Sequence, residues 1–240
     1  MFTEIVTLSA LVKITLMTMI KEHEVLVIDD FISTDYQEQI KSILIGEERF
    51  KGNEFSWLFL DDVTVSNPSN EDHLYSDEMD IHNGQAIKYE NYSQRRPAFT
   101  HSYVYYEDDG TGSIDSEFHE LFAPLLQRGA LKGMGTTEVN VLQGRSFLQL
   151  PLNLRNRDVD TPHIDLYEGH KHIVVLYYVC DSDGDTIIYN EKTKSDEYTI
   201  KERVTPKQGR VVIFDGGLYH TAEQPINNVR CVVNYNLVLQ

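Results

Sequence analysis

The chain is poor in cysteine, in positive charge and in long apolar runs, and each shortage argues against a class of protein. Two cysteines among 240 residues, Cys180 and Cys231, are too few for a disulfide framework. We interpret them as buried free thiols in a reducing cytoplasm. The chain has 21 lysines and arginines but 38 aspartates and glutamates, which gives a net charge of −17. A nucleic-acid substrate is therefore disfavoured, because phosphate binding needs a basic surface.

The most apolar stretch runs from Phe2 to Ile20, but Lys13 interrupts it and Glu4 lies near its start. A membrane-spanning helix needs about 20 predominantly apolar residues, and a signal peptide needs a basic start and a cleavage site after small residues. Neither pattern is met, so we expect no membrane span and a cytoplasmic protein. We predict that residues 1–24 form an N-terminal extension.

The length and a hydrophobic content of 41% fit one globular domain over residues 1–240. We predict that residues 25–130 supply supporting strands and helices and that residues 131–240 form a β core. In the first part, strands are expected at 25–31 and 99–106, and a strand or another buried element is expected at 55–60. Ser33 or Thr34 is expected to begin a helix that ends near Gly46, and a second helix is expected at 116–126.

The residues that point to chemistry are His163, Asp165 and His220. His163 and Asp165 are two residues apart, so in a strand their side chains lie on the same face. His220 follows after several strand-like runs. Two imidazoles and one carboxylate form the facial triad that holds non-haem Fe(II) and leaves coordination positions open. The bare His-x-Asp pattern has low specificity for a metal site. The surrounding sequence makes the assignment more specific, because strands are predicted nearby at 172–180, 186–190, 210–214 and 229–239.

The last predicted strand alternates between two kinds of side chain. Its odd positions are apolar or aromatic, and its even positions are largely polar: Arg230, Val232, Asn234 and Asn236. A period of two places each set on its own face of the strand. We expect the polar face to line a cavity, where Arg230 offers a fixed cation to a carboxylate-bearing co-substrate.

Taken in order, these motifs resemble a known family. Pro162-His163-Ile164-Asp165, the segment 206–214, Tyr219-His220 and Arg230 are similar to the 2-oxoglutarate- and Fe(II)-dependent dioxygenases, in the prolyl-4-hydroxylase-like branch. The resemblance covers about residues 133–240, and the strand at 25–31 is similar to an early strand of the same family. The compact, acidic chain is also similar to homologues encoded by tailed phages of marine bacteria, which implies a host cytoplasm.

The resemblance implies a mainly β fold with flanking helices, a double-stranded β-helix or cupin-like jelly-roll. It implies Fe(II) bound by His163, Asp165 and His220, with 2-oxoglutarate and O2 as co-substrates and ascorbate as a reductant. Oxidative decarboxylation to succinate and carbon dioxide would accompany hydroxylation of an unactivated C–H bond. The implied substrate is a peptidyl residue, with proline first, or else a free amino acid or small metabolite.

The resemblance also implies roles in binding the co-substrate. Arg230 would pair with the distal carboxylate of 2-oxoglutarate, and Tyr178 aligns with a tyrosine that helps to hold the same group. Asn234 falls where relatives often carry a threonine or serine contact. The chain departs from the pattern at Asn153, where some prolyl hydroxylases have a tyrosine; an asparagine can still donate a hydrogen bond there.

Other interpretations stay open at this stage. A zinc site could use His163, His170, His172 and His220. The chain could also be a jelly-roll module that binds a metal or ligand without turnover, since fold does not fix function. Nucleic-acid demethylation would need a basic groove. The substrate, the oligomeric state and any closure of loops 67–94 and 107–116 over the site are not readable from the sequence.

Overall fold

The computed structural model describes residues 25–46, 55–60, 79–82, 85–88, 96–107, 109–126, 139–152, 162–166 and 170–239. The predicted extension at 1–24, Asn153 and most of the 67–94 loop lie outside these residues. No helix in the described part is long and apolar enough to cross a membrane. The division into one domain with a supporting and a core part stays a prediction.

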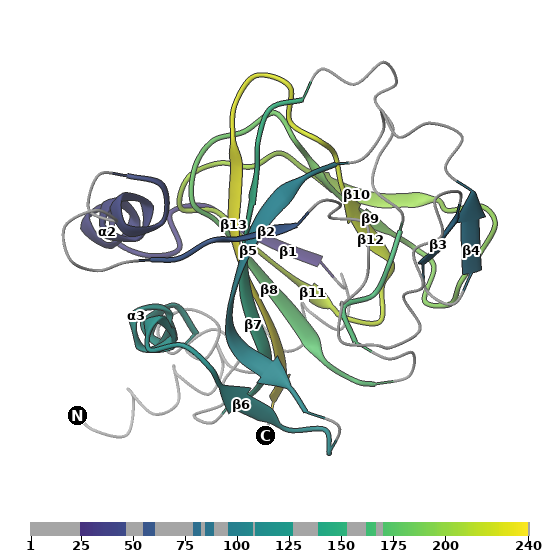
Figure 1. Ribbon diagram of the computed structural model, residues 1–240, viewed down its shortest axis with the longest axis horizontal. Helices are drawn as coiled ribbons and strands as arrows, with labels where there is room; N and C mark the ends of the chain where they lie inside the picture. The colour runs from purple at the N-terminus through teal and green to yellow at the C-terminus, as the bar shows by residue number, and fades with distance from the viewer. Residues whose placement is uncertain are drawn as a thin grey trace, which may run out of the picture.

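Two helices are described, and both lie on the same side of the large sheet (Figure 1). Helix α2 (Thr34–Ile45) begins after the predicted cap Ser33, whose backbone carbonyl accepts hydrogen bonds from the first turn, and it ends at Gly46. Its apolar stripe of Ile40, Ile43 and Leu44 is buried, as the helical spacing predicted. Helix α3 (Phe118–Leu125) matches the second predicted helix.

The large sheet has eight strands, and β13 and β8 lie near its centre. Its order is β1 (Val25–Ile28), β11 (Val211–Asp215), β8 (Ile173–Tyr178), β13 (Arg230–Leu239), β7 (Val139–Gln149), β5 (Ala98–Tyr106) and β2 (Leu58–Leu60), with β6 (Gly112–Ile114) paired to β5. Every described pairing in this sheet is antiparallel. Successive side chains of each strand point to opposite faces of this sheet, so each face can pack against a different layer of the molecule.

A smaller sheet faces the large one. It contains β10 (Ile200–Val204), β9 (Thr186–Tyr189) and β12 (His220–Ala222), and His163 extends it through an isolated antiparallel bridge to His220. Figure 1 shows this sheet on the side of the large sheet opposite the helices. A separate two-stranded sheet pairs β3 (Met79–His82) with β4 (Gln85–Lys88).

From β7 onward the chain passes back and forth between the two layers. It visits β7, the His163 segment, β8, β9 and β10, β11, β12 and finally β13, which alternates the large and the small sheet. This alternation is the winding of a double-stranded β-helix, so the predicted fold class is confirmed. One face of the large sheet packs on the helices. The other face packs on the small sheet through the apolar cluster Val174, Leu176, Tyr178, Ile188, Val204, Val212, Phe214, Leu218 and Val232.

The polar positions of β13 lie in the interior of the molecule. Arg230, Asn234 and Asn236 are buried on the face of the large sheet that also carries Val232 of the inter-sheet cluster. Burial of such groups is costly unless they have partners. The burial of these three polar residues therefore indicates a functional site between the two sheets.

Candidate metal centre

The two histidines of the predicted triad are brought together by backbone pairing. The amide of His163 donates to the carbonyl of His220 at 3.0 Å, and the amide of His220 donates to the carbonyl of His163 at 2.9 Å. Directly paired residues of an antiparallel bridge turn their side chains to the same side. The two imidazole ring centres consequently lie 4.7 Å apart.

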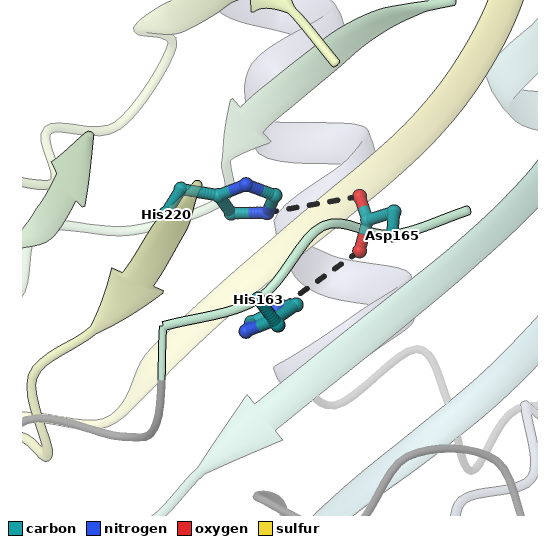
Figure 2. Close-up of side chains that lie close together, drawn as sticks. All are labelled: His163, Asp165 and His220. Atoms are coloured by element: carbon teal, nitrogen blue, oxygen red, sulfur yellow. Dashed lines mark ion pairs between the residues drawn. The ribbon is translucent and has the colours of Figure 1, made fainter. Parts of the chain in front are cut away.

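Asp165 lies on a bend after this bridge, so the predicted strand over the His-x-Asp triplet is confined to His163. Its carboxylate still reaches both imidazoles: Oδ1 is 3.9 Å from Nε2 of His163, and Oδ2 is 3.8 Å from Nε2 of His220. Figure 2 shows both rings next to this carboxylate, one near each of its oxygens. One ligand atom from each residue falls within 4.8 Å of the others.

Each oxygen of the Asp165 carboxylate has its own donor from the large sheet. Arg145 Nη2 donates to Oδ1 at 3.2 Å, and Asn234 Nδ2 donates to Oδ2 at 2.9 Å. Arg145 on β7 and Asn234 on β13 are direct cross-strand partners, which places both on one face. The carboxylate is thereby oriented by two adjacent strands of the large sheet.

The electrostatic surroundings favour an ionised Asp165 and a neutral His220. Burial alone would raise the pKa of Asp165, whose side chain is 4% exposed, but His220, Arg145 and His163 outweigh it and lower that pKa. Burial lowers the pKa of His220 despite the nearby Asp165. These are the protonation states in which a carboxylate and an imidazole bind a metal.

The tautomer of His220 follows from its neighbour. Its Nδ1 lies 3.2 Å from the carbonyl oxygen of Leu218. A carbonyl only accepts, so Nδ1 carries the hydrogen and Nε2 keeps its lone pair. Nε2 is also the atom that lies near Asp165.

The donor set fits a divalent first-row metal. Two imidazole nitrogens and one carboxylate within 4.8 Å match the ligand types of the non-haem Fe(II) facial triad. Among the described residues no other group of three or more His, Cys, Asp or Glu side chains has this arrangement. In particular, His172 uses Nδ1 on the carbonyl of His170 at 2.8 Å, and the alternative four-histidine zinc site is not assembled.

The predicted cation Arg230 begins β13 and is buried, with 5% of its surface exposed. Its described hydrogen bonds run from Nε to Gly184 O at 3.1 Å, from Nη1 to Gln149 Oε1 at 3.0 Å and from Nη2 to Thr186 Oγ1 at 2.8 Å. All three acceptors are uncharged oxygens from two segments, the start of β9 with the residues just before it and the end of β7. They fix the guanidinium plane between the two sheets.

Tyr178 lies in the same group. Its hydroxyl donates to Thr186 Oγ1 at 2.7 Å, and its ring centre is 6.0 Å from the carbon of the Arg230 guanidinium. Burial raises the pKa of Tyr178 in spite of the nearby cation, so the phenol stays protonated. The structure thus places Arg230 and Tyr178 together, as expected. It places Asn234 against Asp165, and the predicted contact of Asn234 with a co-substrate stays a prediction.

Sequence reasoning missed Arg145, Gln149 and Thr186. Arg145 and Gln149 belong to β7, which was not predicted as a strand, and only the register of β7 against β13 brings them opposite Asn234 and Arg230. Thr186 begins a predicted strand, but nothing in its sequence context indicates that its hydroxyl meets Tyr178. No regular alternation along 139–149 marks either of the first two, so no local signal in the sequence could have found them.

No protein-family model matches the sequence, and no curated protein matches it. Solved structures do. An oxidoreductase of the 2OG-Fe(II) oxygenase family from Burkholderia pseudomallei aligns with a TM-score of 0.60 and 10% identity, over 94% of this chain and 90% of that one. A Trichoplax adhaerens prolyl hydroxylase in complex with a peptide fragment aligns with a TM-score of 0.55 and 11% identity, over 98% and 92%.

The epimerase SnoN, in complex with Fe3+, alpha ketoglutarate and nogalamycin RO, aligns with a TM-score of 0.54 and 10% identity, over 93% of this chain and 82% of that one. Identities this low establish a likeness of fold. This chain therefore shares the double-stranded β-helix fold of the 2-oxoglutarate and Fe(II) oxygenases, as the sequence motifs predicted.

Proposed function

We propose that this chain is an oxygenase that uses Fe(II), 2-oxoglutarate and O2 to hydroxylate an unactivated C–H bond. The observation that carries the proposal is the convergence of His163, Asp165 and His220 from two segments onto one place, with ligand atoms within 4.8 Å. The Fe3+ and alpha ketoglutarate bound by the similar structure of SnoN support the same ligands here. A module that binds metal without turnover would not need the buried Arg230 group beside it.

The three triad residues would hold the metal, and the rest of the chain would keep them ready. Asn234 orients the carboxylate of Asp165, and the carbonyl of Leu218 keeps Nε2 of His220 available. Such outer contacts commonly set metal affinity. When bound, Fe(II) would supply open coordination positions and the redox activity that lets O2 act as the oxidant, which side chains lack.

Arg230 and Tyr178 would bind the distal carboxylate of 2-oxoglutarate. A guanidinium presents N–H groups in the plane that a carboxylate can accept. Arg230 precedes Asn234 by four residues on β13, which corresponds to about 13 Å along the strand at roughly 3.3 Å per residue. Side chains reaching inward from both ends of this span leave a length suited to a short dicarboxylate. The apolar walls contributed by Val232 and Phe147 exclude water and strengthen the charge pairing.

For the substrate, we propose a peptidyl residue, with proline as the first candidate. The order of the sequence motifs and the likeness to the peptide-bound Trichoplax hydroxylase support it. The likeness to SnoN supports a second candidate, a small metabolite or free amino acid. We also propose a cytoplasmic location, which the two free, buried cysteines support.

The decisive experiment measures succinate formed from 2-oxoglutarate by protein reconstituted anaerobically with Fe(II) and then exposed to oxygen. We expect turnover in the parent protein, none in His163→Ala, and a raised 2-oxoglutarate requirement in Arg230→Ala. Lys207→Ala is the matched control, because its exposed ion pair with Asp29 involves no residue of the triad or of the Arg230 group. Equal succinate from parent and His163→Ala, or no 2-oxoglutarate binding by the parent, would refute the proposal.

The substrate is tested separately, by mass spectrometry. Proline-containing peptides and free amino acids are incubated with the active protein and examined for the gain of one oxygen atom. Gain of oxygen on peptides alone supports the first candidate, and gain on free amino acids alone supports the second.

A further inference from the structure

The buried group around Arg230 contains an amide whose orientation is fixed by chemistry. Gln149 is 1% exposed, and its Oε1 accepts a hydrogen bond from Nη1 of Arg230 at 3.0 Å. A guanidinium has no acceptor atom, so the oxygen of the amide must face Arg230 and the NH2 group must face elsewhere. The usual ambiguity of an amide side chain does not arise at this position.

The NH2 group of Gln149 is a buried donor with no hydrogen-bond partner among the described residues. Leaving such a donor unsatisfied is costly, and buried polar groups of native proteins are nearly always bonded. A ligand that accepts a hydrogen bond is a specific explanation for an orphan donor inside a candidate binding site. The group around it therefore indicates the chemistry of that ligand.

The register of the large sheet places this donor beside the cation. Gln149 on β7 is the direct partner of Arg230 on β13, so the two side chains lie on the same face. The next pair along the same face is Phe147 and Val232, which borders the apolar cluster between the sheets. Nε2 belongs to the same planar amide as Oε1 and is thus held next to the guanidinium. A neutral donor and a charged donor therefore lie side by side, next to the apolar cluster between the sheets.

We propose that Gln149 Nε2 donates a hydrogen bond to the distal carboxylate of 2-oxoglutarate, beside the guanidinium of Arg230. The inference rests on the proposed function and adds to it a residue that selects the co-substrate. Gln149 then has two contacts: its oxygen holds Arg230, and its nitrogen holds the ligand. A 2-oxo acid without the distal carboxylate gains nothing from the second contact.

The test is a calorimetric titration of two 2-oxo acids into protein loaded with Mn(II), which avoids turnover. One is 2-oxoglutarate; the other is 2-oxovalerate, with the same carbon chain but no distal carboxylate. Gln149→Glu keeps an oxygen acceptor for Arg230 and replaces the donor by an anionic oxygen. Gln149→Met removes both contacts and keeps a similar volume. Gln143→Met, on the same strand and opposite Asn236, is the matched control.

We expect both substitutions at Gln149 to weaken 2-oxoglutarate binding by about 10-fold or more, the loss of a hydrogen bond to a charged group. Binding of 2-oxovalerate should change less than about twofold, and Gln143→Met should leave both affinities unchanged. Thermal unfolding shows that each variant is folded, and Gln149→Glu suffices if Gln149→Met does not fold.

An equal loss for both oxo acids would overturn the inference, because Gln149 would then only shape the pocket. Unchanged 2-oxoglutarate affinity in Gln149→Glu would overturn it as well, while leaving the proposed function intact. Absence of 2-oxoglutarate binding by the parent protein would instead overturn the proposed function, and this inference with it.

Discussion

Replacing Asn234 by leucine should weaken metal binding although Asn234 is not one of the three proposed ligands. Its Nδ2 donates to Oδ2 of Asp165 at 2.9 Å, and a hydrogen bond to a charged group contributes about 1.5–3 kcal/mol. Leucine has a similar volume and no donor, so the carboxylate loses one of its two anchors and Arg145 remains the other. The same range corresponds to about a 10- to 150-fold change in an equilibrium constant. Losses of 10- to 100-fold are typical for contacts of this kind.

The assay is anaerobic calorimetric titration of Fe(II), repeated with Mn(II), into the parent protein and Asn234→Leu. Asn236→Leu is the matched control. Asn236 is the same residue type on the same face of β13, it is also buried, and its Nδ2 donates to Gln143 at 3.1 Å instead of to the triad. We expect the control to change metal affinity by less than about threefold.

Equal metal affinities in the parent protein and Asn234→Leu would refute this reasoning. So would an equal loss in the two leucine variants, because the effect would then follow from disturbing β13 rather than from releasing Asp165. Thermal unfolding of both variants separates a loss of affinity from a loss of structure.

Three further predictions concern stability. Mn(II) at 100 times its dissociation constant should stabilise the parent by about 2.7 kcal/mol, and the rise in Tm should vanish in His163→Ala. Asp183→Ala removes a carboxylate that accepts backbone hydrogen bonds from residues 226–228 at 3.0–3.3 Å, and calorimetry should find about 2 kcal/mol less stability. Burial acts to raise the pKa of Asp183, but these hydrogen bonds outweigh it and lower that pKa. The stabilisation by the Asp183 carboxylate is therefore fully present above the ordinary carboxyl pKa and is lost as the pH falls through the lowered pKa of the folded protein. Plots of stability against pH for the parent protein and Asp183→Ala should converge there. Gly144→Ala would place a Cβ 2.4 Å from the Tyr235 ring; we expect a cost of about 1–3 kcal/mol, and an unchanged Tm would show that the ring has room to move.

The late strands were predictable because their alternation is regular. The run at 229–239 became β13 with ends that match within one residue, and 210–214 and 186–190 became β11 and β9 with similar agreement. In these segments β-branched and aromatic residues dominate both faces or one face cleanly, and turn residues bound them. The helix after Ser33 was predictable for the same reason, since its apolar spacing and Gly46 gave both ends.

Strand β7 was not predicted, because neither of its faces has a uniform character. On the face toward the helices, Gly144 makes room for the ring of Tyr235, and Ser146 hydrogen-bonds the hydroxyl of Tyr103. On the other face, Arg145 donates a hydrogen bond to Asp165, and Gln149 accepts one from Arg230. When each residue of a strand makes its own specific contact, apolar and polar residues no longer alternate with a period of two. A strand cannot then be predicted from the sequence pattern.

The sequence could single out His163, Asp165 and His220 as candidates, which the structure brings together, but it could not show how they are assembled. The spacing of His163 and Asp165 indicated two ligands close together, and the tail of the chain indicated His220. The backbone bridge that sets the two imidazoles side by side is a long-range pairing. So are the contacts of Arg145 and Asn234 with Asp165. Such pairings depend on the register of strands far apart in the chain, which no local pattern specifies.

The placement of the three proposed ligand residues has a mechanical consequence. His163 and His220 belong to the small sheet, whereas Asp165 is tied by Arg145 and Asn234 to the large one. A divalent ion bound by all three would therefore cross-link the small sheet to the large one. Separating the layers would require breaking coordination bonds as well as apolar packing. Amide hydrogen exchange at His163 and His220 should slow on metal loading by more than it does at the far edge strand β2, because local opening of the small sheet would then carry the cost of releasing the ion.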